Sequence, residues 1–117
     1  MTNVTIEGFV THDPVVKKTK SGKNLCDFSV AVNHSSSGDN EPKVSFFDVE
    51  TWEGVAEFSS ANIRRGSKVI VFGSLRQDRW ENTEGKIRSK VKIIANSVRY
   101  FENHASEKTN EKVAASA

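Results

Sequence analysis

The sequence predicts an all-β fold, a five-stranded barrel with one short helix between its third and fourth strands. Three observations lead to this prediction. Apolar and polar residues alternate along several separate stretches, which is the period of half-buried strands. Glycines interrupt two of these stretches, at Gly8 and Gly73, where a small sheet has to bend to close on itself. A single stretch, residues 54–65, has the spacing and end signals of a helix.

The chain has 117 residues, which is enough for one domain with one core. We expect this domain to cover residues 1–103. Residues 104–117 contain almost no large apolar side chain and are expected to form a disordered tail. The single cysteine, Cys26, cannot form an internal disulfide, and with no second Cys or His nearby it is a poor zinc ligand or nucleophile. It is predicted to be a small core residue in a reducing compartment.

The first two strands are predicted at Val4–Val10 and Leu25–Asn33. Between them lies a polar segment around Ser21-Gly22, which we expect to be an exposed hairpin loop. This loop carries Lys17, Lys18, Lys20 and Lys23. Its lysines are suited to contact phosphates, although such a loop also serves to keep a surface soluble. His12, just before the loop, is expected at the surface.

The third strand, Val44–Trp52, has two distinct faces. One face carries Phe47 and Val49. The other carries Phe46, Asp48, Glu50 and Trp52. Because carboxylates are rarely part of a core, this second face is predicted to meet solvent or a partner. The alternative for Trp52 is a structural role, capping the bottom of the barrel or the helix.

The helix over residues 54–65 is expected to close one end of the barrel. Val55, Phe58 and Ile63 can turn inward from it. Arg64 and Arg65 would then lie in its last turn, followed by a glycine at the C′ position, residue 66.

The last two strands are predicted to carry a cationic face. In the fourth, Val69, Val71 and Leu75 are expected to point inward, whereas Ile70 and Phe72 point outward, toward a neighbouring subunit or nucleic acid. In the fifth, cations alternate with inward apolar residues. The cations are Arg88, Lys90 and Lys92, and the apolar residues are Val91, Ile93 and Ala95. Rings close to such cations, here Trp80, are typical of surfaces that bind single-stranded nucleic acid.

The distribution of charge supports this face more than the total does. The chain has 17 Lys and Arg against 15 Asp and Glu, a net charge of +2. Residues 64–99, in contrast, contain ten Lys and Arg against three acids. Such a segment can form a local cationic patch on a nearly neutral protein. No apolar run reaches membrane-spanning length, and the N-terminus does not have the pattern of a signal peptide.

Several motifs, taken in order, resemble the bacterial-type single-stranded DNA-binding proteins. They are V-T-I-E-G-F-V-T-H-D-P, F-S-V-A-V-N, S-F-F-D-V-E-T-W, N-I-R-R-G-S-K-V and V-F-G-S-L-R-Q-D-R-W. The resemblance runs from residue 4 to about residue 101 and implies an OB-fold. It also implies a cytoplasmic, nucleoid-associated homotetramer that coats single-stranded DNA in replication, recombination and repair. No catalytic activity, metal or cofactor is implied.

The resemblance implies that Phe46, Trp52 and Trp80 stack on bases. It implies that basic side chains follow the phosphates: Lys17, Lys18, Lys20, Lys23, Arg76, Arg79, Arg88, Lys90 and Lys92. Two departures change the expectations. A serine run, residues 35–37, stands where the family often has another tryptophan. The tail also has no acidic tip, so recruitment of replication and repair enzymes is not expected.

Three other functions remain open from the sequence. The domain could bind proteins first and single strands weakly, or it could prefer RNA, because stacking and phosphate contacts do not distinguish the sugar. A nuclease would need a cluster of metal ligands, and Asp48 with Glu50 is the nearest arrangement.

Overall fold

The computed structural model describes residues 1–34, 43–101 and 111–115. Its elements are β1 (Val4–Val10), β2 (Val15–Lys18), β3 (Asn24–His34), β4 (Lys43–Trp52), α1 (Glu53–Asn62), β5 (Lys68–Glu81), β6 (Ile87–Phe101) and β7 (Glu111–Ala115). The predicted fold class is confirmed: five long strands carry one helix between the third and the fourth of them.

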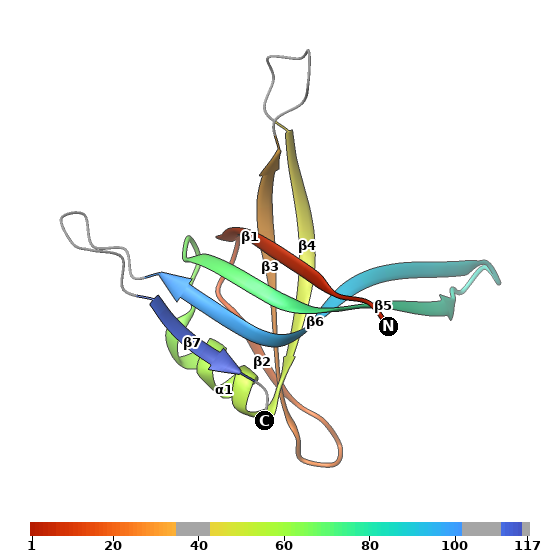
Figure 1. Cartoon of the computed structure of the whole chain (residues 1–117). Helices are drawn as coiled ribbons and strands as arrows, with labels where there is room; N and C mark the ends of the chain where they lie inside the picture. Colours follow the sequence, from red (N-terminus) through yellow and green to blue (C-terminus); the bar gives the residue numbers. More distant parts are fainter. Residues whose placement is uncertain (35–42, 102–110, 116–117) are drawn as a thin grey trace.

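Five strands close into a ring in the order β1, β5, β6, β4, β3 (Figure 1). The ring closes because the end of β1 also pairs with β3, at Phe9 with Ala31 and Val10 with Val30. The β4–β6 pairing is parallel and the other pairings of the ring are antiparallel. Side chains from all five strands fill the ring, with Phe28 and Ile93 among the largest fully buried ones. Cys26 is also fully buried, as predicted.

Two glycines allow the tight crossings of this ring. A Cβ atom at Gly8 would lie 2.1 Å from the backbone oxygen of Ala31, and one at Gly73 would lie 2.2 Å from that of Ile94. The register of β5 and β6 also shifts between Phe72 and Gly73, which marks a bulge. Both positions were predicted as bends, and the absence of a side chain is what lets the strands approach.

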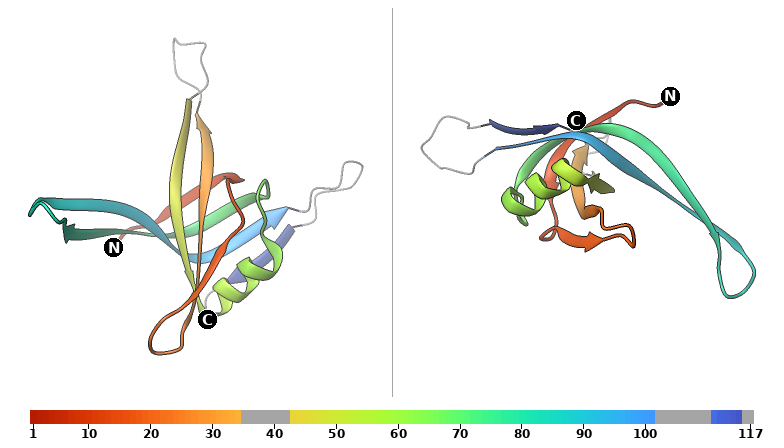
Figure 2. Two further views of the ribbon diagram at one scale, coloured as in Figure 1. Left: turned by 180° about the vertical axis from the view of Figure 1, so that it is seen from behind. Right: turned by 90° about the horizontal axis from the view of Figure 1, so that it is seen from below.

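Helix α1 is shorter than predicted. Ile63 already has an extended backbone, with φ −94° and ψ 135°, and its buried side chain packs into the core. The prediction that Arg64 and Arg65 lie in the last turn is therefore wrong, although Arg64 still donates hydrogen bonds to the carbonyls of Ser60 and Ile63. Gly66 is not the C′ residue but forms a turn with φ +87°. The helix packs beside the ring (Figure 2).

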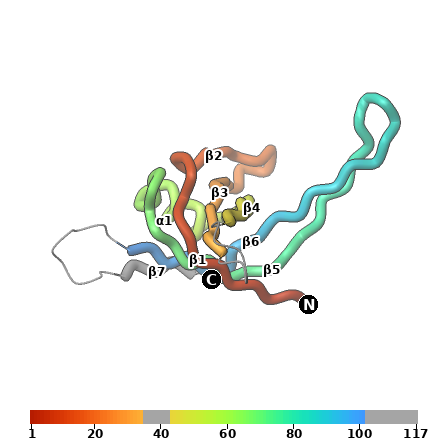
Figure 3. Tube along the Cα trace, turned by 90° about the horizontal axis from the view of Figure 1, so that it is seen from above, coloured from red at the N-terminus to blue at the C-terminus, as the bar shows by residue number. Residues whose placement is uncertain are grey.

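The β5–β6 pair continues beyond the ring as a two-stranded arm, which stands away from the body of the molecule (Figure 3). Leu75 and Val91 were predicted to point inward, yet they are 46% and 55% exposed. They have the inward parity of their strands, but on the arm no other strand of the described residues lies across from them. The alternation of apolar and polar residues thus continues along the arm, although the apolar side chains of this part lie outside the core.

Two strands were not expected. Strand β2 pairs with β3 and places Lys17 and Lys18 in a strand instead of a loop. Strand β7 pairs with the last part of β6, so residues 111–115 differ from the expected disorder of the tail. The serine run at residues 35–37 and the remaining tail positions, 104–110 and 116–117, lie outside the described residues. Among the described helices, none is long and apolar enough to cross a membrane.

Candidate nucleic-acid interface

The outer surface of β3, β4 and the arm gathers most of the predicted site residues. On β4, alternate side chains from Phe46 to Trp52 share this surface. On the arm, Trp80 pairs directly with Arg88, and Arg76 pairs directly with Lys92. Because paired residues lie on the same side of a sheet, these four side chains continue the surface of β4. We call it the outer face.

Glu50 lies at the centre of the outer face and is only 5% exposed. The prediction that its strand face meets solvent or a partner is wrong at this position. Its carboxylate accepts a hydrogen bond from Lys92 Nζ at 3.0 Å and one from Trp52 Nε1 at 2.7 Å. Arg76 Nη1 forms an ion pair with the same carboxylate, at 3.2 Å from Glu50 Oε2. The carboxylate can be buried because three donors replace its water.

Two half-buried acids extend this ion network. Asp48 Oδ2 pairs with Lys90 Nζ at 2.5 Å, and Asp48 Oδ1 accepts a hydrogen bond from Ser29. Asp78 pairs with Arg76 Nε at 3.0 Å and with Lys92 Nζ at 2.8 Å. Three of the predicted phosphate contacts are therefore already bound to carboxylates of the protein itself.

The network shifts the acids toward their charged form. Hydrogen bonds from Lys90 and Ser29 lower the pKa of Asp48. Burial raises the pKa of Glu50, but the hydrogen bonds from Lys92 and Trp52 and the nearby cations more than offset it, so that the net shift is downward. Hydrogen bonds from Lys92 and Arg76 likewise lower the pKa of Asp78. All three carboxylates are thus ionised at neutral pH and hold their cations in place.

A hollow of about 170 Å³ opens between β3, β4 and β6 at this network. Its lining includes His12, Asp27, Asp48, Glu50, Lys90 and Lys92. His12 is exposed, as expected, but it lies at the rim of the hollow and was not predicted to be near the site.

Two of the three predicted stacking rings, Trp80 and Phe46, lie outside the network, whereas Trp52 is bound to it. Trp80 is 48% exposed on the arm and Phe46 is 67% exposed on β4. Trp52 is half-buried, at the N-cap position of α1, with its indole N–H bound to Glu50. Trp52 thus stands at the N-cap position by its backbone alone, because its side chain makes no hydrogen bond to the helix, and its ring is partly exposed on the outer face.

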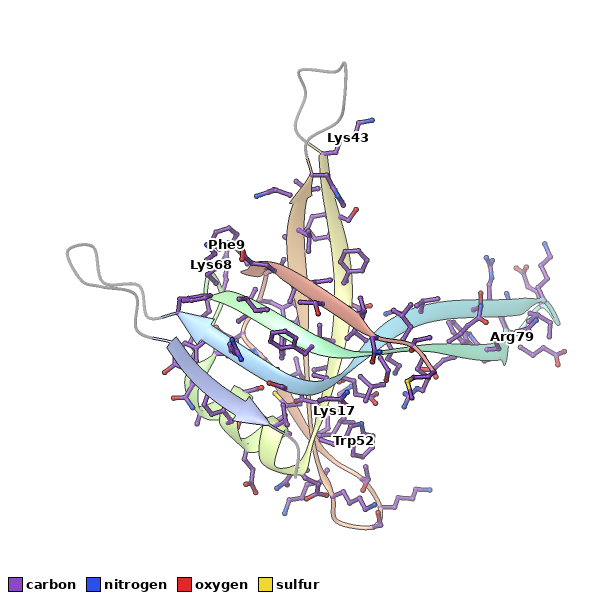
Figure 4. All side chains as sticks on the ribbon, in the orientation of Figure 1. Phe9, Lys17, Lys43, Trp52, Lys68 and Arg79 are labelled. Atoms are coloured by element: carbon purple, nitrogen blue, oxygen red, sulfur yellow. The ribbon has the colours of Figure 1, made fainter. Side chains whose placement is uncertain are left out.

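Two predicted cations on the arm, Arg88 and Arg79, lie apart from the network. Arg88, beside Trp80, has no carboxylate partner among the residues that the structure describes. Arg79 lies on the arm (Figure 4). It pairs with Ser89 and is next to Trp80 in the strand, so it points to the opposite side of the arm from Trp80. The structure does not bring Arg79 together with the other site residues.

The lysine hairpin lies next to Trp52. Lys17 pairs with Leu25, which pairs with Trp52, so the three residues form one row across β2, β3 and β4. Lys17 Nζ is 3.3 Å from Asp27 Oδ2. Lys18, Lys20 and Lys23 are exposed along the strand and tip of the same hairpin, with no carboxylate partner in the described part of the chain.

The comparisons with known proteins concern the family and the fold of the chain. Residues 1–101 match the model of the "Single-strand binding protein family". The chain belongs to the single-strand binding protein family. A single-stranded DNA-binding protein of Treponema pallidum is 44% identical over 98 residues, which cover 82% of this chain and 55% of that protein. Single-stranded DNA-binding protein 1 of Synechocystis is 36% identical and covered to 79%, with 82% of this chain matched.

A solved structure supports the fold of this family member. The chain of a Plasmodium falciparum SSB complex with ssDNA has a TM-score of 0.75 and 21% sequence identity. The match covers 81% of this chain and 86% of that chain. At this identity the likeness concerns the fold alone.

The sequence analysis did not predict the role of Glu50 at the centre of the outer face. The signal was present in the spacing Asp48, Glu50 and Trp52, with cations at the same period in residues 88–92. This pattern was interpreted as two separate faces, an acidic one and a basic one, whereas the structure joins them through ion pairs. Among the described residues, no group of three or more His, Cys, Asp or Glu could hold a metal ion.

Proposed function

We propose that this protein binds single-stranded DNA without sequence preference and coats it during replication, recombination and repair. One observation on the arm carries the proposal: the exposed ring of Trp80 lies beside Arg88. Among the described residues, no carboxylate pairs with Arg88. A ring for a base and a cation for the adjacent phosphate are the two elements of such binding. Phe46, Trp52 and the lysine hairpin supply further elements of both kinds on the outer face.

The proposal includes the assembly and location typical of the family. We expect a homotetramer in the cytoplasm, associated with the nucleoid, and no catalytic step. Ile70 and Phe72, half-buried on the outside of β5, offer apolar surface for contact between copies. The relatives named above are called single-stranded DNA-binding proteins, and this supports single-stranded DNA as the ligand.

Titration with oligo-dT, followed by tryptophan fluorescence, tests the proposed function. We expect strong quenching by the single strand, a weak response to a duplex of equal length, and a loss of affinity with salt. Absence of binding to the single strand in a parallel gel would contradict the proposal. A stronger response to oligo-rU than to oligo-dT would instead favour RNA as the ligand.

Trp80→Ala should weaken binding of oligo-dT by about 1–3 kcal/mol, because one stacked base loses its ring. Folding should be unaffected, since this ring is half-exposed on an arm outside the core. Fluorescence anisotropy of a labelled oligo-dT measures the affinity, and urea unfolding checks the stability. Unchanged affinity per folded molecule would remove Trp80 from the interface.

Arg88→Ala should reduce the slope of log affinity against log salt by about 0.7, the value for one released counterion on a single strand. Lys90→Ala should reduce it less, because the Lys90 ammonium is already neutralised by Asp48 at 2.5 Å. The two variants remove one charge each from neighbouring positions of β6, so each serves as the control for the other. Equal reductions would mean that the Asp48–Lys90 pair opens on binding.

A further inference from the structure

The hollow between β3, β4 and β6 differs in charge from the surface around it. Its charged lining consists of Asp27, Asp48, Glu50, Lys90 and Lys92. The carboxylates thus outnumber the ammonium groups, and both ammonium groups are already bound to carboxylates at 3.0 Å or less. The hollow therefore disfavours a phosphate, although it lies on the outer face. Its volume of about 170 Å³ is far more than the roughly 10–15 Å³ that one water needs.

The ion pair of Asp48 and Lys90 has hydrogen-bonding capacity to spare. Its two side chains are 43% and 56% exposed. A carboxylate has about four acceptor sites and an ammonium group has three donors. Among the described residues, Asp48 accepts from Lys90 and Ser29 only, and Lys90 donates to Asp48 only. Acceptor and donor sites therefore remain open side by side at the hollow.

An acceptor beside a donor complements the Watson–Crick edge of every base. In adenine and cytosine the amino group is a donor, and the neighbouring ring nitrogen is an acceptor. In guanine and thymine a carbonyl oxygen is the acceptor, and the neighbouring ring N–H is the donor. Single-stranded bases present this edge to proteins. A carboxylate next to an ammonium group can bind either order, because the base can be placed with either group opposite the carboxylate.

An exposed ring lies beside the pair. Phe46 precedes Asp48 by two residues on β4, and both side chains lie on the outer face. Alternate residues of a strand are about 7 Å apart. Phe46 is 67% exposed, and its partner on β3 is the small residue Ala31. A base that stacks on Phe46 therefore has the Asp48–Lys90 pair within reach of its edge.

We propose that the Asp48–Lys90 pair binds the Watson–Crick edge of a base that stacks on Phe46, whichever base this is. The proposal rests on the proposed function, because the base belongs to the bound single strand. The adjoining ring and the excess of carboxylates in the hollow favour a base over a phosphate. Lys90 is thus assigned to a base, in contrast to the phosphate contact expected from the sequence. The pair adds affinity without selecting a sequence.

An isostere of thymine tests this contact. Difluorotoluene has the shape of thymine but carries C–F and C–H groups in place of the two carbonyls and the N3–H. Affinities for oligo-dT and for the difluorotoluene oligomer, each of about 16 nucleotides, are measured by anisotropy of labelled strands. Asp48→Ala with Lys90→Ala removes acceptor and donor together and leaves the net charge unchanged. In this double variant the preference for oligo-dT over the isostere should fall roughly three- to tenfold, because its hydrogen bonds to the base are lost.

Three comparisons control this result. Asp48→Lys with Lys90→Asp reverses the pair and still places a donor beside an acceptor, so it should keep the preference of the natural chain. Oligo-dC should lose as much affinity as oligo-dT in the alanine double variant. The salt slope should be the same in all these proteins, since the pair is neutral as a whole. Circular dichroism checks folding, and Asp48→Leu with Lys90→Met, which retains the side-chain volumes, repeats the test in a second variant.

The outcomes separate this contact from the proposed function. An unchanged preference for oligo-dT in the double variants that lack the pair overturns the contact and leaves single-strand binding intact. A loss confined to one base, or a loss of preference in the reversed pair, would show that the pair reads a fixed pattern and would overturn its tolerance. A lower salt slope in the double variants would assign the pair to a phosphate and also overturn the contact. Failure of the natural chain to bind any single strand overturns the proposed function itself.

Discussion

Gly8→Ala and Gly73→Ala are each expected to lower the free energy of unfolding by about 3 kcal/mol, at the upper end of the range for overpacked interiors. In both cases the new methyl group would overlap a backbone oxygen of the neighbouring strand, at 2.1 Å from Ala31 and 2.2 Å from Ile94. A backbone oxygen in a ladder cannot rotate away as a flexible side chain can, so the strands themselves would have to separate. Urea unfolding followed by circular dichroism measures the change.

Gly54→Ala is the matched control for these two substitutions. Gly54 lies in the first turn of α1, and a Cβ atom there would have no heavy atom within 4 Å. Alanine is favoured over glycine in helices by up to about 1 kcal/mol, so this variant should be as stable as the natural chain or more stable. If Gly8→Ala and Gly73→Ala were also neutral, the ring could open at these corners without loss, and its closure would not stabilise the fold.

The two glycines show which part of the fold the sequence predicts well. Alternation with period two places the strands, and a glycine at an inward position marks a bend, because both signals arise from local geometry. The same reasoning found the helix and the buried Cys26. The end of the helix was misplaced by three residues, because Ile63 is drawn into the core in an extended conformation that local signals do not report.

Local sequence patterns did not predict which side chains of distant strands pair with each other. The carboxylates of β4 were assigned to an exposed face, and Glu50 became buried only because Arg76 and Lys92 reach it from two other strands. The same pairing reduces the number of free cations on the predicted basic stripe. Leu75 and Val91 show the opposite error, since an alternating pattern does not reveal where the ring ends and the arm begins.

Glu50→Gln is expected to lower the free energy of unfolding at neutral pH by about 1.5–3 kcal/mol, the range for hydrogen bonds to a charged group. The amide keeps the volume and can still accept the hydrogen bond from Trp52 Nε1, but it no longer balances Arg76 and Lys92. The cost stays below that of a fully buried ion pair, because the side chain of Arg76 is 44% exposed and Asp78 still binds both cations. Asp27→Asn, which removes an exposed pair with Lys17, is the control and should change stability by less than about 0.5 kcal/mol.

The acid dependence of stability distinguishes this charge effect from a packing defect. The pKa of Glu50 is lowered from its ordinary value of 4.5, so its contribution is present above that pH and is lost as the pH falls through the folded-state pKa. In the natural chain the free energy of unfolding should therefore fall with acid over this window, and in Glu50→Gln it should fall less. Equal acid dependence in the two proteins would mean that the carboxylate is not stabilised by its cations.

The same substitution should have the opposite effect on DNA binding. With Glu50 uncharged, Arg76 and Lys92 are neutralised only by Asp78, so about one more cation becomes available to phosphate. Glu50→Gln should then bind oligo-dT more tightly at low salt, with a salt slope steeper by about 0.7. A less stable protein that binds more tightly would show that the buried carboxylate stabilises the fold at the expense of affinity. Weaker binding with an unchanged slope would instead mean that Glu50 acts by holding the ring of Trp52 in position.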